Sequence, residues 1–321
     1  MANAGTFLIF ADNYQTVAIQ NSLMQLISAF FRLRSLSFLL LLPLFLLQSC
    51  SEHIPPRILI FSKTAGYRHA CIPVATEALR KMCLENGIAV DTTEESEDFT
   101  ENNLKRYNAV VFLCTTGDVL TPTQEADFER YIQAGGGFVG IHSATDTEYG
   151  WTWFGGLVGA YFNGHPKQQN ATLHVEDHNH AATKHLKGND WTRFDEWYNF
   201  KDLNPKTQVL LTIDEASYEG GTNGKTHPMS WYQEYDGGRA FYTALGHTNE
   251  SYAEPDFMQH VLGGIKYAIG KQKRLNYSAA RTPEQPDPTR FVKTVLANEL
   301  TEPMELDMFP DGKIIFIERR G

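Results

Sequence analysis

The histidine at position 142 follows residues that predict a sharp, strained turn. Gly135 to Ile141 is glycine-rich and then mostly apolar, which indicates a short buried strand that ends at His142. Gly140 lies two residues before this histidine and Ala144 two residues after it, the spacing of a nucleophile elbow. An elbow needs small flanking residues because its backbone is strained and comes close to its neighbours. A histidine at the tip is not the ordinary acyl nucleophile, so amide or ester hydrolysis by the usual route is not expected.

Most histidines of the chain, His142 included, fall into two groups. Histidine is the usual metal ligand and the physiological general base, so those beside predicted strand ends are candidates for a site. These candidates are His69, His142, His227 and His247. The remaining cluster, within residues 174–185, matches no zinc signature and is interpreted as a solvated surface loop.

A second constellation is the run Asp195-Glu196-Trp197-Tyr198, in which two carboxylates adjoin two aromatic residues. A carboxylate against an indole ring can have a raised pKa, which suits a general acid. Adjacent residues of a strand face opposite ways, so only one carboxylate can point into a given pocket. We favour Glu196, the alternative being a charge at a strand edge. Arg68 can hold an anionic or hydroxyl-rich ligand, or serve as an ion-pair partner.

The composition excludes a nucleic-acid surface. The 321 residues carry a net charge of −10, and the basic residues are scattered. The chain is long enough for one or two domains with a core. A helix from residue 72 to 86 would separate Cys71 from Cys83 by about 18 Å, too far for a disulfide. With Cys114, these cysteines are interpreted as small buried apolar residues.

Residues 1–50 are predicted to be a lipoprotein signal segment. Arg32 and Arg34 precede an apolar run that ends at Leu47-Gln48-Ser49-Cys50, too short for a spanning helix and similar to a bacterial lipobox. Lipidation of Cys50 would anchor the protein to a membrane without spanning it. Met24 is an alternative start. The localisation expected is therefore export, as a lipoprotein of the bacterial cell envelope.

The first half of the remaining chain alternates short apolar strands with amphipathic helices. Strands are predicted at 57–61, 89–90, 109–113 and 138–141, with helices at 73–86 and 121–133 and a helix end at 104–107. This alternation indicates a parallel sheet covered on both faces, whose ligand crevice lies beyond the carboxyl ends of the strands. His69, His142 and His247 are therefore predicted to converge there.

The second half adds strand-like segments at 172–175, 208–213, 229–235 and 240–245, and a helix at 256–269. The polar, proline-containing segment 271–288 is interpreted as a linker. Residues 289–321 contain a Pro-Asp-Gly turn followed by an apolar strand, half of a hairpin. One hairpin cannot bury a core of its own, so this tail is interpreted as the truncated start of a further domain.

Five segments together resemble the ThuA-like (trehalose-utilisation) domain. They are Phe61 to His69, Gly135 to Thr145, Asp195 to Phe200, His227 to Trp231 and Gly238 to Thr248. The resemblance covers residues 56–270. It implies an α/β, flavodoxin-like fold related to class I glutamine amidotransferases, with a mostly parallel sheet flanked by helices and extra strands in the second half. The tail is similar to the opening of a quinone-dependent sugar dehydrogenase propeller, of which the rest is missing.

The resemblance implies a role in the catabolism of disaccharides or 3-keto-sugars. We expect an enzyme in which His142, His247 and Glu196 are catalytic, with His142 and His247 as acid/base groups or ligands of a divalent metal. Substrate is expected to contact Arg68, His69, Trp197 and His227. Lyase, isomerase and hydrolase chemistry remain open. The rival hypothesis is a non-catalytic carbohydrate-binding module; a glutaminase or protease is disfavoured because the elbow lacks a cysteine.

Overall fold

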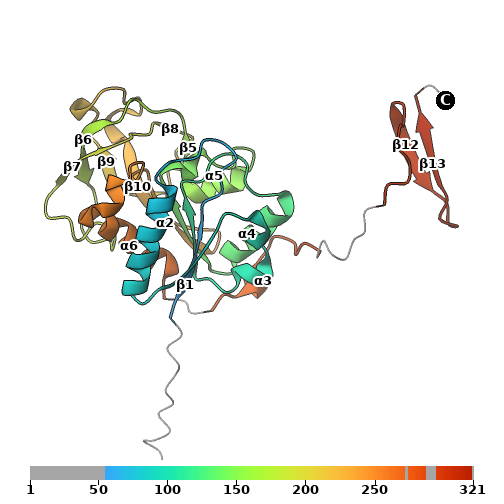
Figure 1. Ribbon diagram of the computed structural model, residues 1–321, viewed down its shortest axis with the longest axis horizontal. Helices are drawn as coiled ribbons and strands as arrows, with labels where there is room; N and C mark the ends of the chain where they lie inside the picture. The colour runs from blue at the N-terminus through green and yellow to red at the C-terminus, as the bar shows by residue number, and fades with distance from the viewer. Residues whose placement is uncertain (1–54, 272–273, 287–293, 320–321) are drawn as a thin grey trace, which may run out of the picture. The chain divides into compact units, whose positions relative to one another are not determined.

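The computed structural model describes residues 55–271, 274–286 and 294–319. Nine of its strands form one sheet (Figure 1). They are β1 (Arg57–Phe61), β2 (Ala89–Thr93), β3 (Ala109–Leu113), β4 (Gly137–Ile141), β6 (Gln169–Val175), β7 (Asp190–Asp195), β9 (Gln208–Ile213), β10 (Pro228–Tyr235) and β11 (Gly238–Thr243). Their order across the sheet is β2-β1-β3-β4-β11-β10-β9-β6-β7.

The strands β2, β1, β3, β4 and β11 are parallel to their neighbours, in the strand order of flavodoxin-like folds. This confirms the predicted fold class. The strands β10, β9, β6 and β7 then extend the sheet in antiparallel pairs. The sequence predicts three of them, at 229–235, 208–213 and 172–175, but it does not predict β7, and the segment predicted at 240–245 corresponds to β11 in the parallel part. Because this extension alternates in direction, β7 ends at the same edge of the sheet as β11.

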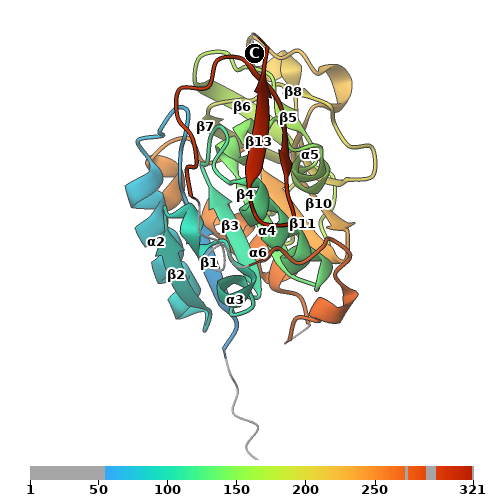
Figure 2. The same cartoon turned by 90° about the vertical axis from the view of Figure 1, so that its right-hand side faces the viewer.

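Helices cover both faces of the sheet (Figure 2). They are α2 (Ile72–Glu85), α3 (Glu101–Leu104), α4 (Pro122–Gln133), α5 (Thr152–Val158) and α6 (Pro255–Ile269). The helices α2 and α6 lie side by side on one face, and α3 and α4 pack together on the other. The helix end expected at 104–107 is corrected, because α3 itself ends at Leu104 and the chain then turns into β3.

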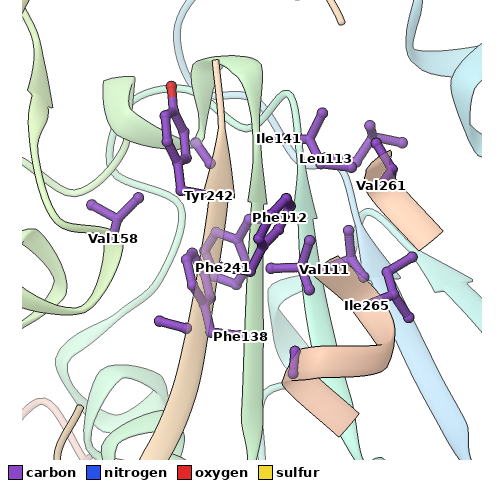
Figure 3. Close-up of a cluster of buried hydrophobic side chains, with 14 of the residues drawn as sticks. Val111, Phe112, Leu113, Phe138, Ile141, Val158, Phe241, Tyr242, Val261 and Ile265 are labelled. Carbon is purple, nitrogen blue, oxygen red and sulfur yellow. The ribbon is translucent and has the colours of Figure 1, made fainter. Parts of the chain in front are cut away.

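The core explains why the parallel strands are wholly apolar. All five residues of β3 are buried, as a strand covered on both faces requires. Figure 3 shows Val111 of β3 in one buried cluster with Val261 and Ile265 of α6. Fully burying each such side chain contributes about 1.5–3 kcal/mol. This packing fixes the positions of the strand ends that carry the histidines.

Two smaller sheets complete the described structure. The first pairs β5 (Tyr161–Phe162) with β8 (Phe200–Lys201) and so brings the loop after β5 close to the segment after β7. The second is a hairpin of β12 (Pro303–Met308) and β13 (Ile314–Glu318), turned at Gly312, whose φ of 83° suits glycine. The hairpin predicted in the tail is therefore present.

Part of the predicted linker is bound to α4. The backbone N–H groups of Arg281 and Thr282 donate to Gln133 Oε1 at 2.7 and 2.9 Å, and Thr282 Oγ1 donates to Glu129 Oε2 at 2.6 Å. Arg281 and Thr282 of the predicted linker are therefore held against α4. Within the described residues no helix is both long and apolar enough to span a membrane. Cys50 and the predicted signal segment lie outside them.

Candidate functional site

The turn at His142 has the strained backbone that its neighbours predict. His142 directly follows β4 with a φ of 53°, in the left-handed region that non-glycine residues seldom adopt. A Cβ atom at Gly140 would lie 2.9 Å from Tyr242 Cδ2 and 3.1 Å from Ala144 Cβ. A larger residue at position 140 would therefore collide with its neighbours at the turn. The elbow directs the imidazole to the carboxyl edge of the sheet.

Three predicted histidines come together at this edge. Their ring centroids are 4.8 Å apart for His69 and His142, 5.0 Å for His142 and His247, and 5.2 Å for His69 and His247. Each follows a parallel strand, namely β1, β4 and β11. The parallel order of these strands therefore brings three histidines that are distant in sequence to the same edge of the sheet.

Glu196 is the fourth member of this group. Its Oε2 lies 3.4 Å from His142 Nε2 and 3.1 Å from His247 Nδ1. Glu196 follows the last residue of β7, so it lies just beyond the strand rather than within it. One ligand atom from each of His69, His142, Glu196 and His247 lies within 4.8 Å of the others. We call these four residues the His/Glu cluster.

Hydrogen bonds fix the form of His142. Its Nδ1 lies 2.7 Å from the carbonyl oxygen of Ala244, which can only accept, so the ring proton is on Nδ1. In the neutral ring Nε2 is therefore the nitrogen without a proton, and it faces His247 Nδ1 at 3.0 Å. A ring nitrogen that donates to a backbone carbonyl while the other is free is the usual arrangement of a metal-ligating histidine.

The environment sets the charges of the cluster. Burial, with additional repulsion from His142 and His247, lowers the pKa of His69 to about 3, so this ring is neutral near pH 7. Burial alone would raise the pKa of Glu196, but its interactions with His142 and His247 outweigh it and hold this pKa well below the ordinary value. Burial opposes protonation of His247, yet the hydrogen bond and charge of Glu196 raise its pKa.

These facts favour a cation among the four side chains. When His142 is neutral, its Nε2 and Glu196 Oε2 are both acceptors, and they lie 3.0 and 3.1 Å from His247 Nδ1. Either a proton on His247 or a metal ion can relieve the repulsion between these lone pairs. Neutral imidazoles with one carboxylate form a donor set that suits zinc and other first-row divalent metals. The His/Glu cluster can therefore hold a metal.

Asp195 supports two members of the cluster from behind. Its carboxylate accepts hydrogen bonds from the backbone N–H groups of Glu196 at 2.9 Å, Gly246 at 2.9 Å and His247 at 3.1 Å. Arg193 pairs with the same carboxylate at 3.3 Å. The sequence placed Asp195 beside Glu196 but gave no sign that it joins the segment after β7 to the segment after β11.

His165 is a site residue that the sequence analysis missed. Its Nδ1 lies 3.3 Å from Glu196 Oε1, and its side chain is 42% exposed. It lies in the irregular loop after β5, between Gly164 and Pro166. Glycine and proline predict a loop but give no indication of a functional site. Its ring stacks on that of Tyr198, with centroids 6.0 Å apart.

Three residues expected to contact substrate have other partners. Arg68 forms an ion pair with Glu94 at 2.8 Å. The fully buried Trp197 donates its indole N–H to the carbonyl oxygen of Gln169 at 2.8 Å. His227 is also fully buried, and its two ring nitrogens lie 2.8 Å from Glu215 Oε1 and from the carbonyl oxygen of Tyr198. Neither Trp197 nor His227 offers a free polar atom to a substrate in this structure.

Comparison with known families and structures agrees with this architecture. The ThuA family model, described as trehalose utilisation, matches residues 57–268. The chain belongs to the ThuA family. None of the curated proteins compared with it matches.

Solved ThuA-like structures share the fold. One from Bacteroides uniformis is 22% identical with a TM-score of 0.59, over 71% of this chain and 98% of its own. Another from Parabacteroides merdae is 19% identical with a TM-score of 0.57, over 72% and 98%. A glutaminase domain from Trypanosoma brucei is 8% identical with a TM-score of 0.39, over 69% of this chain and 99% of its own.

Proposed function

We propose that this ThuA protein is an enzyme of carbohydrate catabolism that acts on a disaccharide or keto-sugar at a divalent metal held by the His/Glu cluster. The observation that carries the proposal is the convergence of three imidazoles and one carboxylate within 4.8 Å. The family description, trehalose utilisation, supports a sugar as the substrate class. The elbow lacks a serine or cysteine at its tip, which argues against acyl transfer.

The protonation states and charge of the four side chains suit ligands of a metal ion. His142 is held in the ligating tautomer by Ala244, and His69 is neutral near pH 7 because of its burial. Glu196 supplies the negative charge, and burial strengthens its attraction for a cation. A bound divalent ion would polarise a carbonyl or hydroxyl oxygen of the sugar.

The residues at the mouth of the cluster can bind the sugar and move a proton. His165 Nδ1 and Glu196 Oε1 are close enough to exchange a proton, and His165 is the more exposed of the two. Tyr67 is 66% exposed and contacts the His69 ring edge-on, with centroids 4.9 Å apart. An exposed aromatic ring beside polar groups suits the apolar face of a sugar ring. Removal of a proton next to a keto group, isomerisation and elimination all fit these groups.

The proposal is tested with the full chain and a panel of disaccharides and 3-keto disaccharides. Turnover should be lost after treatment with a chelator and return when Zn²⁺, Mn²⁺ or Co²⁺ is added back. His142→Ala should abolish turnover, whereas His174→Ala should not, since His174 is an exposed residue paired with Asp190. Turnover that survives complete chelation would remove the metal from the proposal but keep the enzyme.

The same experiment separates the enzyme from a carbohydrate-binding module. Sugar binding without turnover of any panel member, in metal-loaded protein, would favour a module that delivers substrate to a partner domain. The candidate for that domain is the propeller of which residues 289–321 are interpreted as the start. These residues lie outside the segment that matches the ThuA family, which ends at residue 268.

We further propose that the protein is exported and anchored by lipid at Cys50. The support is the pattern of Arg32, Arg34 and the apolar run before Leu47-Gln48-Ser49-Cys50. A lipid anchor would keep the enzyme at a membrane surface without a spanning helix.

A further inference from the structure

Two cysteines that are far apart in sequence meet beneath the His/Glu cluster. Cys71 immediately precedes α2, and Cys114 immediately follows β3. Their sulfur atoms lie 3.8 Å apart across 43 residues of chain. Both side chains are buried, with exposed fractions of 1% and 0%.

The third cysteine of the domain provides an internal comparison. Cys83 is equally buried, with 0% exposed. It lies within α2, about 18 Å along the helix from Cys71, beyond the reach of a disulfide. Burial of small apolar side chains explains Cys83 fully, but it does not account for two thiols placed side by side.

We propose that Cys71 and Cys114 form a disulfide that joins the start of α2 to the end of β3. The sulfur atoms need to approach from 3.8 Å to about 2.05 Å, which small side-chain rotations and backbone shifts can supply. The oxidant is a disulfide of the surroundings. The Cys71 thiolate attacks one of its sulfurs and releases a first thiol; the Cys114 thiolate then attacks Cys71 Sγ and releases a second. Two cysteine thiols are oxidised, and one external disulfide is reduced to two thiols.

The proposed disulfide would lie close in sequence to His69 and close in space to the residue before His247. Cys71 lies two residues after His69, and its Sγ is 3.5 Å from the carbonyl oxygen of Gly246, the residue before His247. The disulfide would hold the loop that carries His69 against the end of β3. A closed loop of this length also restricts the unfolded chain, which stabilises the folded protein. The proposal does not depend on a metal or on the substrate.

Peptide mapping of the full chain tests the crosslink. The protein is unfolded and refolded in a buffer of oxidised and reduced glutathione, so that both thiols are accessible before they are buried. Remaining thiols are then alkylated, and the protein is digested without reductant. We expect a linked Cys71–Cys114 peptide and an alkylated Cys83 peptide. Dithiothreitol should convert the linked species to two alkylated peptides.

Serine variants provide the matched controls. Cys83→Ser should keep the linked peptide, whereas Cys71→Ser and Cys114→Ser should each lose it. Oxidation should raise the thermal unfolding midpoint of the wild type and of Cys83→Ser, and leave that of the other two variants unchanged. Alkylation of both Cys71 and Cys114 in the refolded wild type, or a Cys71–Cys83 link, would overturn the proposal.

Discussion

At the residue scale, the site depends on contacts that hold each functional side chain in one orientation. His142 is fixed by Ala244, and Glu196 and His247 are fixed through the backbone by Asp195. Tyr198 packs on the His142 ring, with centroids 4.3 Å apart, and its carbonyl oxygen is bound by the buried His227. The residues around the His/Glu cluster therefore support it, and the fully buried His227 does so through Tyr198.

We predict that Asp195→Asn weakens divalent-metal affinity by about 10–100-fold, the usual cost of losing a supporting contact to metal ligands. An amide oxygen cannot accept all three N–H groups as the carboxylate does, and Arg193 would lose a charged partner. The measurement is a titration of the metal-free protein with Co²⁺, followed by its absorption spectrum.

The control for that change is Asp190→Asn, at an exposed residue of the same strand that pairs with His174. It should leave the affinity and the spectrum as in the wild type. If Asp195→Asn lowered only the thermal midpoint and bound Co²⁺ normally, Asp195 would be structural and not a positioning residue.

The sequence located the four residues of the His/Glu cluster because three of them follow apolar parallel strands and the fourth lies in a carboxylate-aromatic run. It could not locate His165 or assign Asp195, because both act across the antiparallel extension, whose pairing is not visible in local patterns. It expects Trp197 and His227 to contact substrate, whereas in this structure both are buried and hydrogen-bonded to other protein groups. Residue type alone does not say whether an aromatic or imidazole side chain faces a pocket or the core.

At the element scale, the elbow and the buried face of α6 are the parts most sensitive to small changes. Gly140 is enclosed by Tyr242 and Ala144, and His260 of α6 is fully buried, between the carbonyl oxygen of Ala182 and Thr243 Oγ1. The helices and parallel strands could be predicted because apolar periodicity determines them directly. The bounds of α3 could not, and neither α5 nor β7 was predicted, since strand pairing and turns decide where short elements form and end.

Gly140→Ala should destabilise the protein by about 1–3 kcal/mol, the range for overpacking a filled core. The added methyl group would lie 2.9 Å from Tyr242 and 3.1 Å from Ala144, so the elbow must move. Denaturant unfolding measures the change. Gly150→Ala is the control, because a Cβ there meets nothing within 4 Å; equal stabilities of the two variants would contradict the account of the elbow.

His260 should make stability depend on pH. Burial lowers its pKa to about 3 from an ordinary value of 6.5, so the unfolded chain takes up a proton before the folded protein does as the pH falls. The stability this group contributes is therefore present above pH 6.5 and is lost as the pH falls towards 3. Replacement by glutamine should reduce the slope of unfolding free energy against pH in this window by up to about 1.4 kcal/mol per pH unit. A slope identical to that of the wild type would show that His260 does not titrate in this way.

At the scale of the whole molecule, the ThuA fold accounts for residues 57–268, and further residues lie on either side of it in sequence. The stretch around Thr282 is bound to α4, and the hairpin of β12 and β13 lies beyond it in sequence. The predicted lipid anchor would place the enzyme at a membrane surface.

Cys50→Ala should release the protein from the membrane fraction of cells that express the full chain. In the proposed arrangement the lipid on Cys50 is the anchor, and no helix in the described part of the chain is long and apolar enough to span a membrane. Fractionation followed by mass spectrometry checks this expectation. A variant that stays in the membrane fraction, or a wild-type product that retains Arg32 to Leu47, would contradict it.

The most direct test of the central claim is calorimetric titration of the metal-free full chain with Zn²⁺. The account predicts one tight site per chain in the wild type and in His174→Ala, and loss of that site in Glu196→Gln and in His142→Ala. Each of these two variants removes a ligand from the set that lies within 4.8 Å. A wild-type chain that binds no Zn²⁺, or variants that bind it as tightly as the wild type, would contradict the claim that the His/Glu cluster is a metal site.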